Sequence, residues 1–319
     1  MNTQLVSILI PTYNQSGYLQ QAVESALNQD YPHIEVIICD DASKDWDPHL
    51  LDEFEADPRL RIHRNPDNLG RVNNYRLGLY DLASGYWILV LDGDDFLNDS
   101  AYVSRAMQIA ASDSGIDLVF SNAARLNDQG AGNLVAPHEN KTLPKVMEGT
   151  DLFLKLAEEE ISLFHSTAIY KRDKAIDLDF YRSNIISSDW ESLHRYILTG
   201  RVAFIDTIAS VWRIHGKNAT KNISAQDRTN NLQVIAGPYL AARAAGVFKP
   251  SVLDNWLNRR LWKTAFKDVR TLLKTRDHDG LKMYLPALER ISPLTARRIR
   301  RSPKLWVRRI AAHLPGAAN

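Results

Sequence analysis

The 319-residue chain has a single cysteine, Cys39, and therefore cannot form an intramolecular disulfide. It has no apolar run near the roughly 20 residues that a membrane-spanning helix needs. Its N-terminus also lacks the basic and apolar regions of a signal peptide. Neither a Walker A motif nor a G-x-G-x-x-G motif occurs, which argues against an NTPase or a dinucleotide-dependent enzyme. Together these absences predict a cytoplasmic protein, in a compartment where thiols stay reduced.

The composition is that of an ordinary folded protein. Hydrophobic residues make up 45% of the chain and charged residues 24%, which excludes extensive disorder. The formal net charge is only +1, but the charge is unevenly distributed, since no acidic residue follows Glu289. A chain of this length can bury a large core and carry a smaller additional region.

Strand patterns and helical patterns alternate through the first part of the chain. Strands are predicted at 5–10, 34–39, 60–63, 86–91 and 116–120, and helices at 19–27, 71–83 and 100–111. This alternation is typical of right-handed βαβ units, so the predicted class is α/β with a mostly parallel central sheet. Asn14 or Ser16 is the expected cap of the first helix.

The pattern is weaker beyond residue 120. Residues 121–160 are predicted to be mostly loop, followed by a strand at 163–170, a helix at 189–198 and strands within 202–214. A domain boundary is expected near Thr220. The region 221–319 is predicted to be helical, with helices at about 225–245, 253–273 and 280–291.

The strand at 86–91 leads directly into Asp92, Gly93, Asp94 and Asp95. Ligands of open parallel sheets bind at the carboxyl ends of the strands, so these acids are expected to line a cleft. Carboxylates packed together repel one another unless a cation lies among them. Oxygen ligands suit Mg²⁺ or Mn²⁺, which keep open positions for substrate phosphates. The segment therefore predicts a divalent metal site that takes a phosphate-bearing ligand.

Several ordered segments resemble glycosyltransferase family 2. They are 7–14 (SILIPTYN), 25–29 (SALNQ), 37–43 (IICDDAS), 68–70 (NLG) and 91–95 (LDGDD), followed more weakly by 188–191 (SDWE) and 212–215 (WRIH). The resemblance implies a GT-A fold, which is a nucleotide-binding α/β sandwich, and inverting transfer of a sugar from a nucleotide-sugar. Residues 1–220 would be the catalytic domain, with a nucleotide-sugar half at about 1–100 and an acceptor half at about 101–220.

The resemblance also implies roles for residues of the donor site. Asp40 takes the position that reads a uracil or thymine base, so a UDP- or dTDP-sugar is the favoured donor. Pro11, Thr12 and Tyr13 would form the adjacent wall, with Tyr13 near the base or the ribose. The alternative for Asp40 is to cap the turn that follows it. Arg71 would contact the base or a phosphate, or else lie on a solvated helix face.

Four further residues are implied at the predicted metal site. Asp92 would contact the ribose or a metal-bound water, and Asp94 would ligate the metal. Gly93 permits close approach of the backbone. His215 fits the position of a late histidine that reaches the same metal, and this favours Mn²⁺, which tolerates imidazole better than Mg²⁺ does. Asp95 would instead orient the loop or cap the following helix.

Asp189 is the predicted catalytic base, because 188–191 resembles the segment in which an acid begins a helix beneath the acceptor. An inverting transfer is one displacement and needs one such carboxylate. Glu191 is the substitute, and capping of the helix is the alternative role of Asp189. His165 and Trp190 are candidates for the walls of the acceptor site or for the core.

Residues 290–319 are predicted to bind an anionic membrane surface. Trp306, Val307, Ile310 and Leu314 share one side of a helical wheel, and basic residues occupy the remainder. The alternative is a solvated helix packed on its own domain. Nucleic-acid binding is not expected, because no recognition motif accompanies the basic residues. The expected acceptor is a glycan or a lipid-linked glycan of bacterial cell-surface polysaccharide synthesis, used at the inner face of the membrane.

Three other functions remain open from the sequence. A sugar-1-phosphate nucleotidylyltransferase has a related sheet but would carry a glycine-rich loop at about residues 11–14. A glycoside hydrolase also uses paired carboxylates, but it needs neither a nucleotide nor a metal. The non-enzymatic alternative is a membrane-associated scaffold that has retained an inactive transferase fold.

Overall fold

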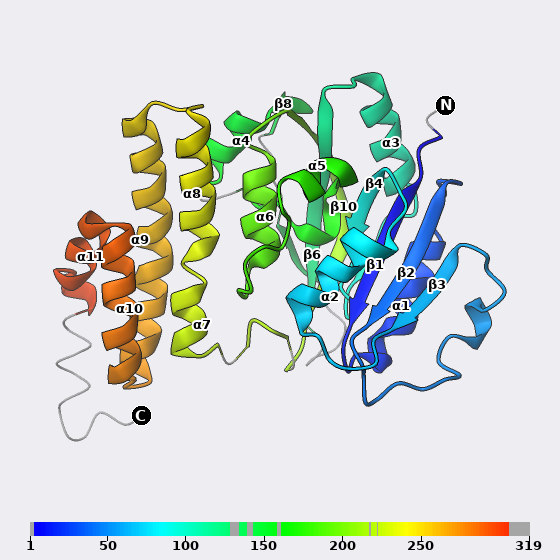
Figure 1. Cartoon of the computed structure of the whole chain (residues 1–319), viewed down its shortest axis with the longest axis horizontal. Coiled ribbons are helices and arrows are strands. Elements are labelled where there is room, and N and C mark those ends of the chain that lie inside the picture. Colours follow the sequence, from blue (N-terminus) through cyan, green and yellow to red (C-terminus); the bar gives the residue numbers. More distant parts are fainter. Residues whose placement is uncertain are drawn as a thin grey trace. The chain divides into compact units, whose positions relative to one another are not determined.

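The structure is a computed structural model, and it describes residues 3–127, 134–138, 143–157, 161–216, 218–221 and 223–305. The chain divides into two compact units (Figure 1). Unit 1 comprises residues 1–184 and 188–218, and unit 2 comprises residues 185–187 and 219–319. Among the described residues, no helix combines the length and the apolar character needed to cross a membrane.

Unit 1 is α/β, and the described part of unit 2 is helical. The strands are β1 (Val6–Thr12), β2 (Ile34–Asp40), β3 (Leu60–Arg64), β4 (Trp87–Val90), β5 (Phe96–Leu97), β6 (Ile116–Asn127), β7 (Leu134–His138), β8 (Val146–Glu148), β9 (Ile169–Lys171) and β10 (Arg201–Ile214). The helices of unit 1 are α1 (Ser16–Leu27), α2 (Arg71–Leu77), α3 (Tyr102–Ser112), α4 (Gly149–Lys155), α5 (Arg172–Asp177) and α6 (Ser188–Tyr196). Those of unit 2 are α7 (Ala225–Asn230), α8 (Gln233–Ala245), α9 (Pro250–Lys274), α10 (His278–Ile291) and α11 (Pro293–Arg300).

The described strands of unit 1 form one mixed sheet. Its order is β3-β2-β1-β4-β9-β6-β10-β5, with β7 beside β6 and β8 beside β10. β3, β2, β1 and β4 are parallel, and Thr12 of β1 lies opposite Asp40 of β2. β9 runs antiparallel to both β4 and β6, and so joins this group to the parallel pair β6–β10. The predicted α/β class is confirmed, and the parallel character is concentrated in the N-terminal strands.

The parallel strands are buried on both faces, which explains their unbroken apolar sequences. On one face, Ile8 and Ile38 belong to a core that also contains Val23 of α1 and Met107 of α3. Full burial of each such aliphatic side chain stabilises the fold by about 1.5–3 kcal/mol. Two helices thus cover one face and fix the plane of the sheet from which the site loops extend.

The helix predicted at 71–83 covers the other face of the sheet. It consists of α2 followed by a π-helical turn, Gly78–Leu82. A Cβ atom at Gly78 would lie 3.1 Å from Cys39 Sγ and 3.4 Å from Leu9 Cδ1, so the glycine permits close packing on the sheet. Burial raises the pKa of the Cys39 thiol to about 12, as expected of a core residue.

The prediction that residues 121–160 are mostly loop was wrong. β6 continues to Asn127, and β7, β8 and α4 also lie in this region. Polar residues inside β6 concealed the strand: Ser121 and Asn122 are buried, and their side chains donate to Thr207 O and Asp206 Oδ1. Hydrogen bonds to Asp206 and Thr207 of β10 replace the apolar contacts that the sequence pattern requires.

The predicted strand at 163–170 is confirmed only at its end, where β9 begins at Ile169, and the predicted cap of the first helix was wrong. A 3₁₀ turn, His165–Thr167, precedes β9, because Thr167 Oγ1 donates back to Phe164 O. The N-cap position of α1 is Gln15, whose side chain makes no capping bond. Asn14 Oδ1 instead accepts from Lys44 N at 2.8 Å and so connects the loops after β1 and β2.

Unit 2 has its own buried polar network. Asp268 of α9 accepts from Arg228 of α7 at 2.9 Å and from Tyr284 of α10 at 3.0 Å. The helix predicted at 225–245 is in fact two helices, α7 and α8. Residues 306–319, with most of the predicted membrane-binding apolar side chains, lie outside the described residues.

Candidate active site

Three acids follow β4 at the carboxyl edge of the sheet. Asp92, Asp94 and Asp95 each present a carboxylate oxygen, and these oxygens lie within 4.8 Å of one another. The loop rests on the end of β1, where Gly93 N donates to Pro11 O at 3.0 Å. A Cβ atom at Gly93 would lie 2.7 Å from Thr12 Oγ1, so this approach requires a glycine.

Negative charge in this acid cluster exceeds what its neighbours neutralise. Burial raises the pKa of Asp94, and Asp92 raises it further, whereas His215 lowers it. Burial, Asp94 and Asp92 together raise the pKa of Asp95 well above its usual value. A divalent cation would relieve this repulsion, and carboxylate oxygens are the ligands that Mg²⁺ and Mn²⁺ prefer. The donor set therefore fits the predicted metal.

His215, at the end of β10, reaches the same place. Its Nε2 lies 2.8 Å from Asp94 Oδ2, and Asn218 Nδ2 donates to that oxygen at 3.3 Å. The imidazole stacks on Tyr18, with ring centroids 5.0 Å apart. Asp94 and His215 are separated by 121 residues in sequence, yet they present ligand atoms side by side.

Arg213 fixes the end of β10 to the acid cluster. Its N donates to Asp95 Oδ1 at 2.9 Å, its Nε donates to Asp94 O at 3.0 Å, and its guanidinium lies 4.8 Å from the centre of the Tyr18 ring. Asp95 therefore orients this part of the structure. It does not cap α3, whose N-cap position is Ala101.

Asp92 faces a second group of residues, carried by α2. Tyr75 Oη donates to Asp92 Oδ1 at 2.6 Å, and the Arg71 guanidinium lies 5.4 Å from the centre of the Tyr75 ring. Burial alone would lower the pKa of Arg71, but Tyr75, Asp189 and Asp92 outweigh it and raise that pKa. Arg71 is thus a permanent cation beside two acids, in contrast to a solvated surface arginine.

Asp189 lies in the first turn of α6 and is partly exposed. Burial raises its pKa, and Asp92 acts in the same direction, whereas His165 and Arg71 lower it. Burial also lowers the pKa of His165, so its imidazole is neutral at neutral pH, and its Nε2 lies 2.7 Å from Tyr181 Oη. The carboxylate therefore has a raised proton affinity and one nearby permanent cation.

Glu191, the substitute base, is differently placed. It is 1% exposed and accepts from Arg182 Nη2 and from Arg195 Nε, each at 2.8 Å. Trp190, the candidate acceptor wall, is partly exposed and packs edge-on against His194. Asp189, and not Glu191, shares its surroundings with Arg71 and Asp92.

Asp40 is fully buried at the end of β2. Its carboxylate accepts from Arg64 Nε at 3.0 Å and from Ser43 N at 3.3 Å, so it does cap the turn that follows. Tyr13, after the neighbouring strand, is 43% exposed. The base-reading role of Asp40 stays a prediction.

The adjacent acid, Asp41, holds the start of α2. Its Oδ1 accepts from Leu69 N at 2.7 Å and its Oδ2 from Gly70 N at 2.9 Å. Gly70 has φ of +84°, a conformation that favours glycine. The helix that carries Arg71 and Tyr75 is therefore tied to the end of β2.

Sequence analysis predicted no role for Tyr75, Arg213, Tyr18 or Tyr181. Two of these had a recognisable signal. Tyr75 lies four residues after Arg71, which places both on one helix face. Arg213 lies near the end of the strand predicted within 202–214, two residues before His215, and belongs to the same segment 212–215 (WRIH) of the family resemblance. The contacts of Tyr18 and Tyr181 depend on the tertiary fold.

Comparison with known proteins identifies the family. The sequence profile of "Glycosyl transferase family 2" matches residues 7–177. The chain belongs to this family. Among individual relatives, the GalNAc(5)-diNAcBac-PP-undecaprenol beta-1,3-glucosyltransferase of Campylobacter jejuni is 28% identical over 194 residues, which are 60% of this chain and 60% of that protein. Four bacterial relatives are 34 to 39% identical, but the matches span only 13 to 39% of their lengths.

Solved structures support the fold. Staphylococcus aureus TarS 1–349 in complex with UDP-GlcNAc has a TM-score of 0.70 at 17% identity, covering 97% of this chain and 89% of that 1–349 chain. The mannosyltransferase PcManGT of Pyrobaculum calidifontis, in complex with GDP-Man and Mn²⁺, has a TM-score of 0.56 at 17% identity, covering 98% and 86%. The predicted GT-A fold with a helical C-terminal region is confirmed.

Proposed function

We propose that this family 2 member is a metal-dependent, inverting glycosyltransferase. It would move a sugar from a nucleoside-diphosphate donor to a hydroxyl group of a glycan or lipid-linked acceptor. The observation that carries the proposal is the convergence of Asp92, Asp94 and Asp95 within 4.8 Å at the carboxyl edge of the sheet. Asp189 lies near enough to Asp92 for their charges to interact. One site thus combines acids suited to a cation with an acid suited to proton transfer.

Asp94 and His215 would hold the cation, Mn²⁺ or Mg²⁺, with Asp92 binding the ribose or a metal-bound water. When bound, the cation supplies positive charge for the departing diphosphate. Arg71 adds a permanent positive charge beside Asp92 and Asp189, where it can contact a phosphate or the base. PcManGT was solved with Mn²⁺, which supports a divalent cation here.

The nucleoside would bind at the ends of β1 and β2. Pro11, Thr12 and Tyr13 would form one wall, and the exposed Tyr13 ring suits stacking on a base or ribose. Asp40 would accept from a pyrimidine N–H. A carboxylate has about four lone-pair sites, so the bonds from Arg64 and Ser43 leave capacity for this one. A UDP- or dTDP-sugar is the favoured donor, and the UDP-GlcNAc complex of TarS supports the first.

Asp189 would accept the proton of the acceptor hydroxyl as its oxygen attacks the anomeric carbon. The bond from that carbon to the diphosphate breaks in the same step, so the configuration inverts. General-base assistance of this kind contributes roughly 10²–10⁴ in rate. Glu191 is neutralised by two arginines and is less suited to the role.

The acceptor is proposed to be lipid-linked and the enzyme to act at the inner face of a bacterial membrane. The Campylobacter relative is named for an undecaprenol-linked acceptor, which supports this class. Residues 290–319 contain no acid, which suits an anionic membrane surface.

Thermal unfolding with a panel of UDP-, dTDP- and GDP-sugars tests the proposal directly. A true donor should raise the unfolding midpoint by mass action, and more strongly with Mn²⁺ than with EDTA. NMR of the product made from that donor should then show the opposite anomeric configuration. Nucleotide affinity that is unaffected by both chelation and Asp94→Ala would disprove the metal-dependent mechanism.

A further inference from the structure

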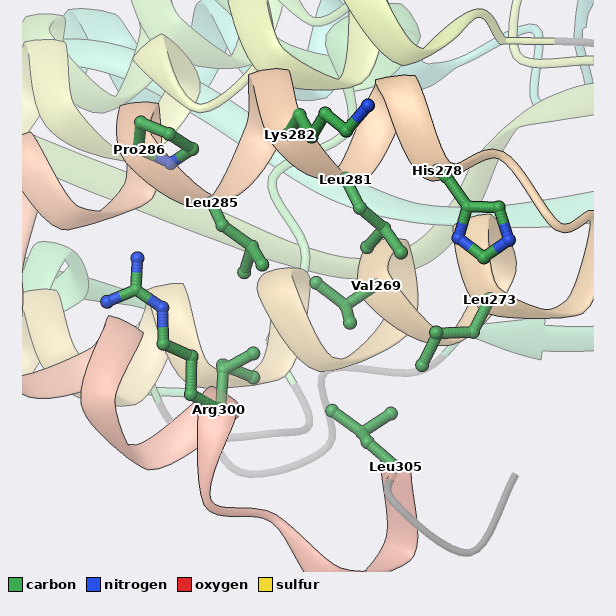
Figure 2. A pocket seen from close by; sticks show the side chains of 10 residues that line it. Val269, Leu273, His278, Leu281, Lys282, Leu285, Pro286, Arg300 and Leu305 are labelled. Atoms are coloured by element: carbon green, nitrogen blue, oxygen red, sulfur yellow. The ribbon is translucent and has the colours of Figure 1, made fainter. Parts of the chain in front are cut away.

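Unit 2 contains an apolar pocket of about 590 Å³ among α9, α10 and α11 (Figure 2). Among the described residues, its apolar lining consists of Val269, Leu273, Leu281, Leu285, Pro286, Ile299 and Leu305, and its other lining residues are basic. We propose that this pocket binds the acyl chain of an anionic phospholipid, with the basic side chains on the phosphate. The inference does not depend on the proposed sugar transfer.

The lining selects an apolar ligand. Val269, Ile299 and Leu305 are no more than 4% exposed, whereas Leu281 and Leu285 are partly exposed and open the pocket to one side. Pockets that bind small molecules commonly measure about 300–1,000 Å³, so the volume is sufficient for a ligand. A cavity with this lining offers water few hydrogen-bond partners and is filled preferentially by apolar groups.

The polar lining residues are all basic. Figure 2 shows His278 and Arg300 on opposite sides of the apolar side chains, and Lys282 also borders the pocket. Residues 278–305 contain seven lysines and arginines but only two acids, Asp279 and Glu289. The ligand should therefore carry a negative charge beside its apolar chain.

The two acids do not neutralise the basic side chains firmly. Lys282 pairs with Asp279 at 2.9 Å and Arg300 pairs with Glu289 at 2.7 Å, but all four side chains are at least 44% exposed. Exposed ion pairs contribute little to stability, so these two pairs compete only weakly with a phosphate. The described lining residues include cations but no carboxylate or amide side chain, which favours an anionic lipid over a peptide.

The sequence continues this chemistry beyond the pocket. Leu305, a lining residue, is the last described residue, and Trp306, Val307, Arg308 and Arg309 follow it in the sequence. A tryptophan next to basic residues suits the level of lipid headgroups. The chain thus leads from an acyl-sized cavity into a segment whose composition matches an anionic membrane interface.

The experiment uses the full chain and cis-parinaric acid, an anionic single-chain probe that fluoresces in apolar surroundings. We expect saturable binding of one probe per chain, competed by lysophosphatidylglycerol but not by inorganic phosphate. Leu285→Trp, which fills the pocket, should weaken binding about tenfold or more, equivalent to about 1.4 kcal/mol. Leu240→Trp, at a 58% exposed position of α8, is the matched control and should bind as the wild type does.

The charge requirement is tested with vesicles. Phosphatidylglycerol-containing vesicles should bind wild-type protein more than pure phosphatidylcholine vesicles do. Lys282→Gln with Arg300→Gln should reduce this difference more than Lys249→Gln with Arg259→Gln, a pair of exposed controls. Thermal unfolding of every variant confirms that it is folded.

Three results would overturn the inference. One is probe binding that is unsaturable or unaffected by Leu285→Trp in a folded variant. Another is competition by inorganic phosphate as strong as that by lysophosphatidylglycerol. The third is binding that appears only after deletion of residues 306–319, because the chain's own C-terminal segment would then be the occupant.

Discussion

Two acidic sites in unit 1, a single aspartate in β6 and the acid cluster after β4, have opposite electrostatic surroundings. At the start of β6, Asp117 is held by Lys171 at 2.8 Å and Lys174 at 2.7 Å. Burial would raise the pKa of Asp117, but the two lysines outweigh it and lower that pKa. At the other group, after β4, Asp94 and Asp95 have raised pKa values because burial and neighbouring acids act together.

Counterions distinguish Asp117 from the acid cluster, because two lysines face Asp117 whereas the cluster acids face one another. Asp117 has two lysines and stabilises the fold when it is ionised, whereas the raised pKa values of Asp94 and Asp95 mean that ionising these acids opposes folding. Perturbed titratable groups of this second kind are typical of functional sites. Glu191, with its two arginines, belongs with Asp117, and this supports Asp189 as the base. Four predictions test the distinction.

The largest effect is expected from Asp189→Asn. Removal of the base should lower kcat by roughly 10²–10⁴ and leave donor affinity almost unchanged. Steady-state kinetics and donor calorimetry measure the two quantities. Glu191→Gln is the matched control, and its main effect should be on stability. If Glu191→Gln lost as much turnover as Asp189→Asn, the assignment of Asp189 as the base would be wrong.

Asp94→Asn should lower turnover by roughly 10²–10³, comparable to the loss of one electrostatic stabiliser of a transition state. In the absence of metal the variant should be more stable than the wild type, because a repelling charge has been removed from a buried cluster. Denaturant unfolding in EDTA checks this sign. A variant that is both inactive and less stable in EDTA would show that the cluster is structural.

Asp117→Asn should cost about 1–3 kcal/mol of unfolding free energy at neutral pH, because it removes charge-assisted hydrogen bonds of a largely buried side chain. The pKa of Asp117 is lower in the folded state than in the unfolded state, so the ionised side chain stabilises the fold fully above the unfolded-state pKa. This stabilisation is lost as the pH falls through the folded-state pKa. Urea unfolding at several pH values measures it. Turnover should not change, and a large loss of kcat would contradict the comparison.

The smallest effect concerns the pH dependence. Asp189 must be ionised to accept a proton, so kcat/KM should fall on the acid side through a pKa above that of a free aspartate. Arg71 lowers the pKa of Asp189, so Arg71→Gln should move this acid limb to higher pH. Arg71→Lys keeps the charge and should leave the limb in place. Equal profiles for the two variants would exclude the electrostatic role.

The sequence anticipated the parts of the fold where local pattern and tertiary environment agree. β1, β2 and β4 are buried on both faces, so apolar runs alone reveal them. The prediction missed β6 beyond Phe120 because the next two residues, Ser121 and Asn122, are polar. Their side chains are buried in the strand through hydrogen bonds to β10. Irregular register between β6 and β10, between Ile205 and Ser210, also interrupts the alternation on which strand prediction depends.

The contacts of the candidate site also divide into those that local sequence predicts and those that depend on the tertiary fold. The acids after β4 are contiguous and follow a strand, so their meeting was predictable. The pairing of Asp94 with His215 came from the family resemblance, since spacing alone cannot bring together residues so distant in sequence. The hydrogen bond from Tyr75 to Asp92 depends on how α2 lies across the sheet, and no local rule specifies that placement.

The bonds from Leu69 N and Gly70 N to Asp41 have a consequence for catalysis. They hold α2 in position before any ligand arrives, so Arg71, in its proposed role, would need little reorganisation to meet a phosphate. The entropy of orienting that cation is lost once, when the chain folds, and not again in every catalytic cycle. Donor encounter should therefore be limited by diffusion and desolvation more than by loop ordering.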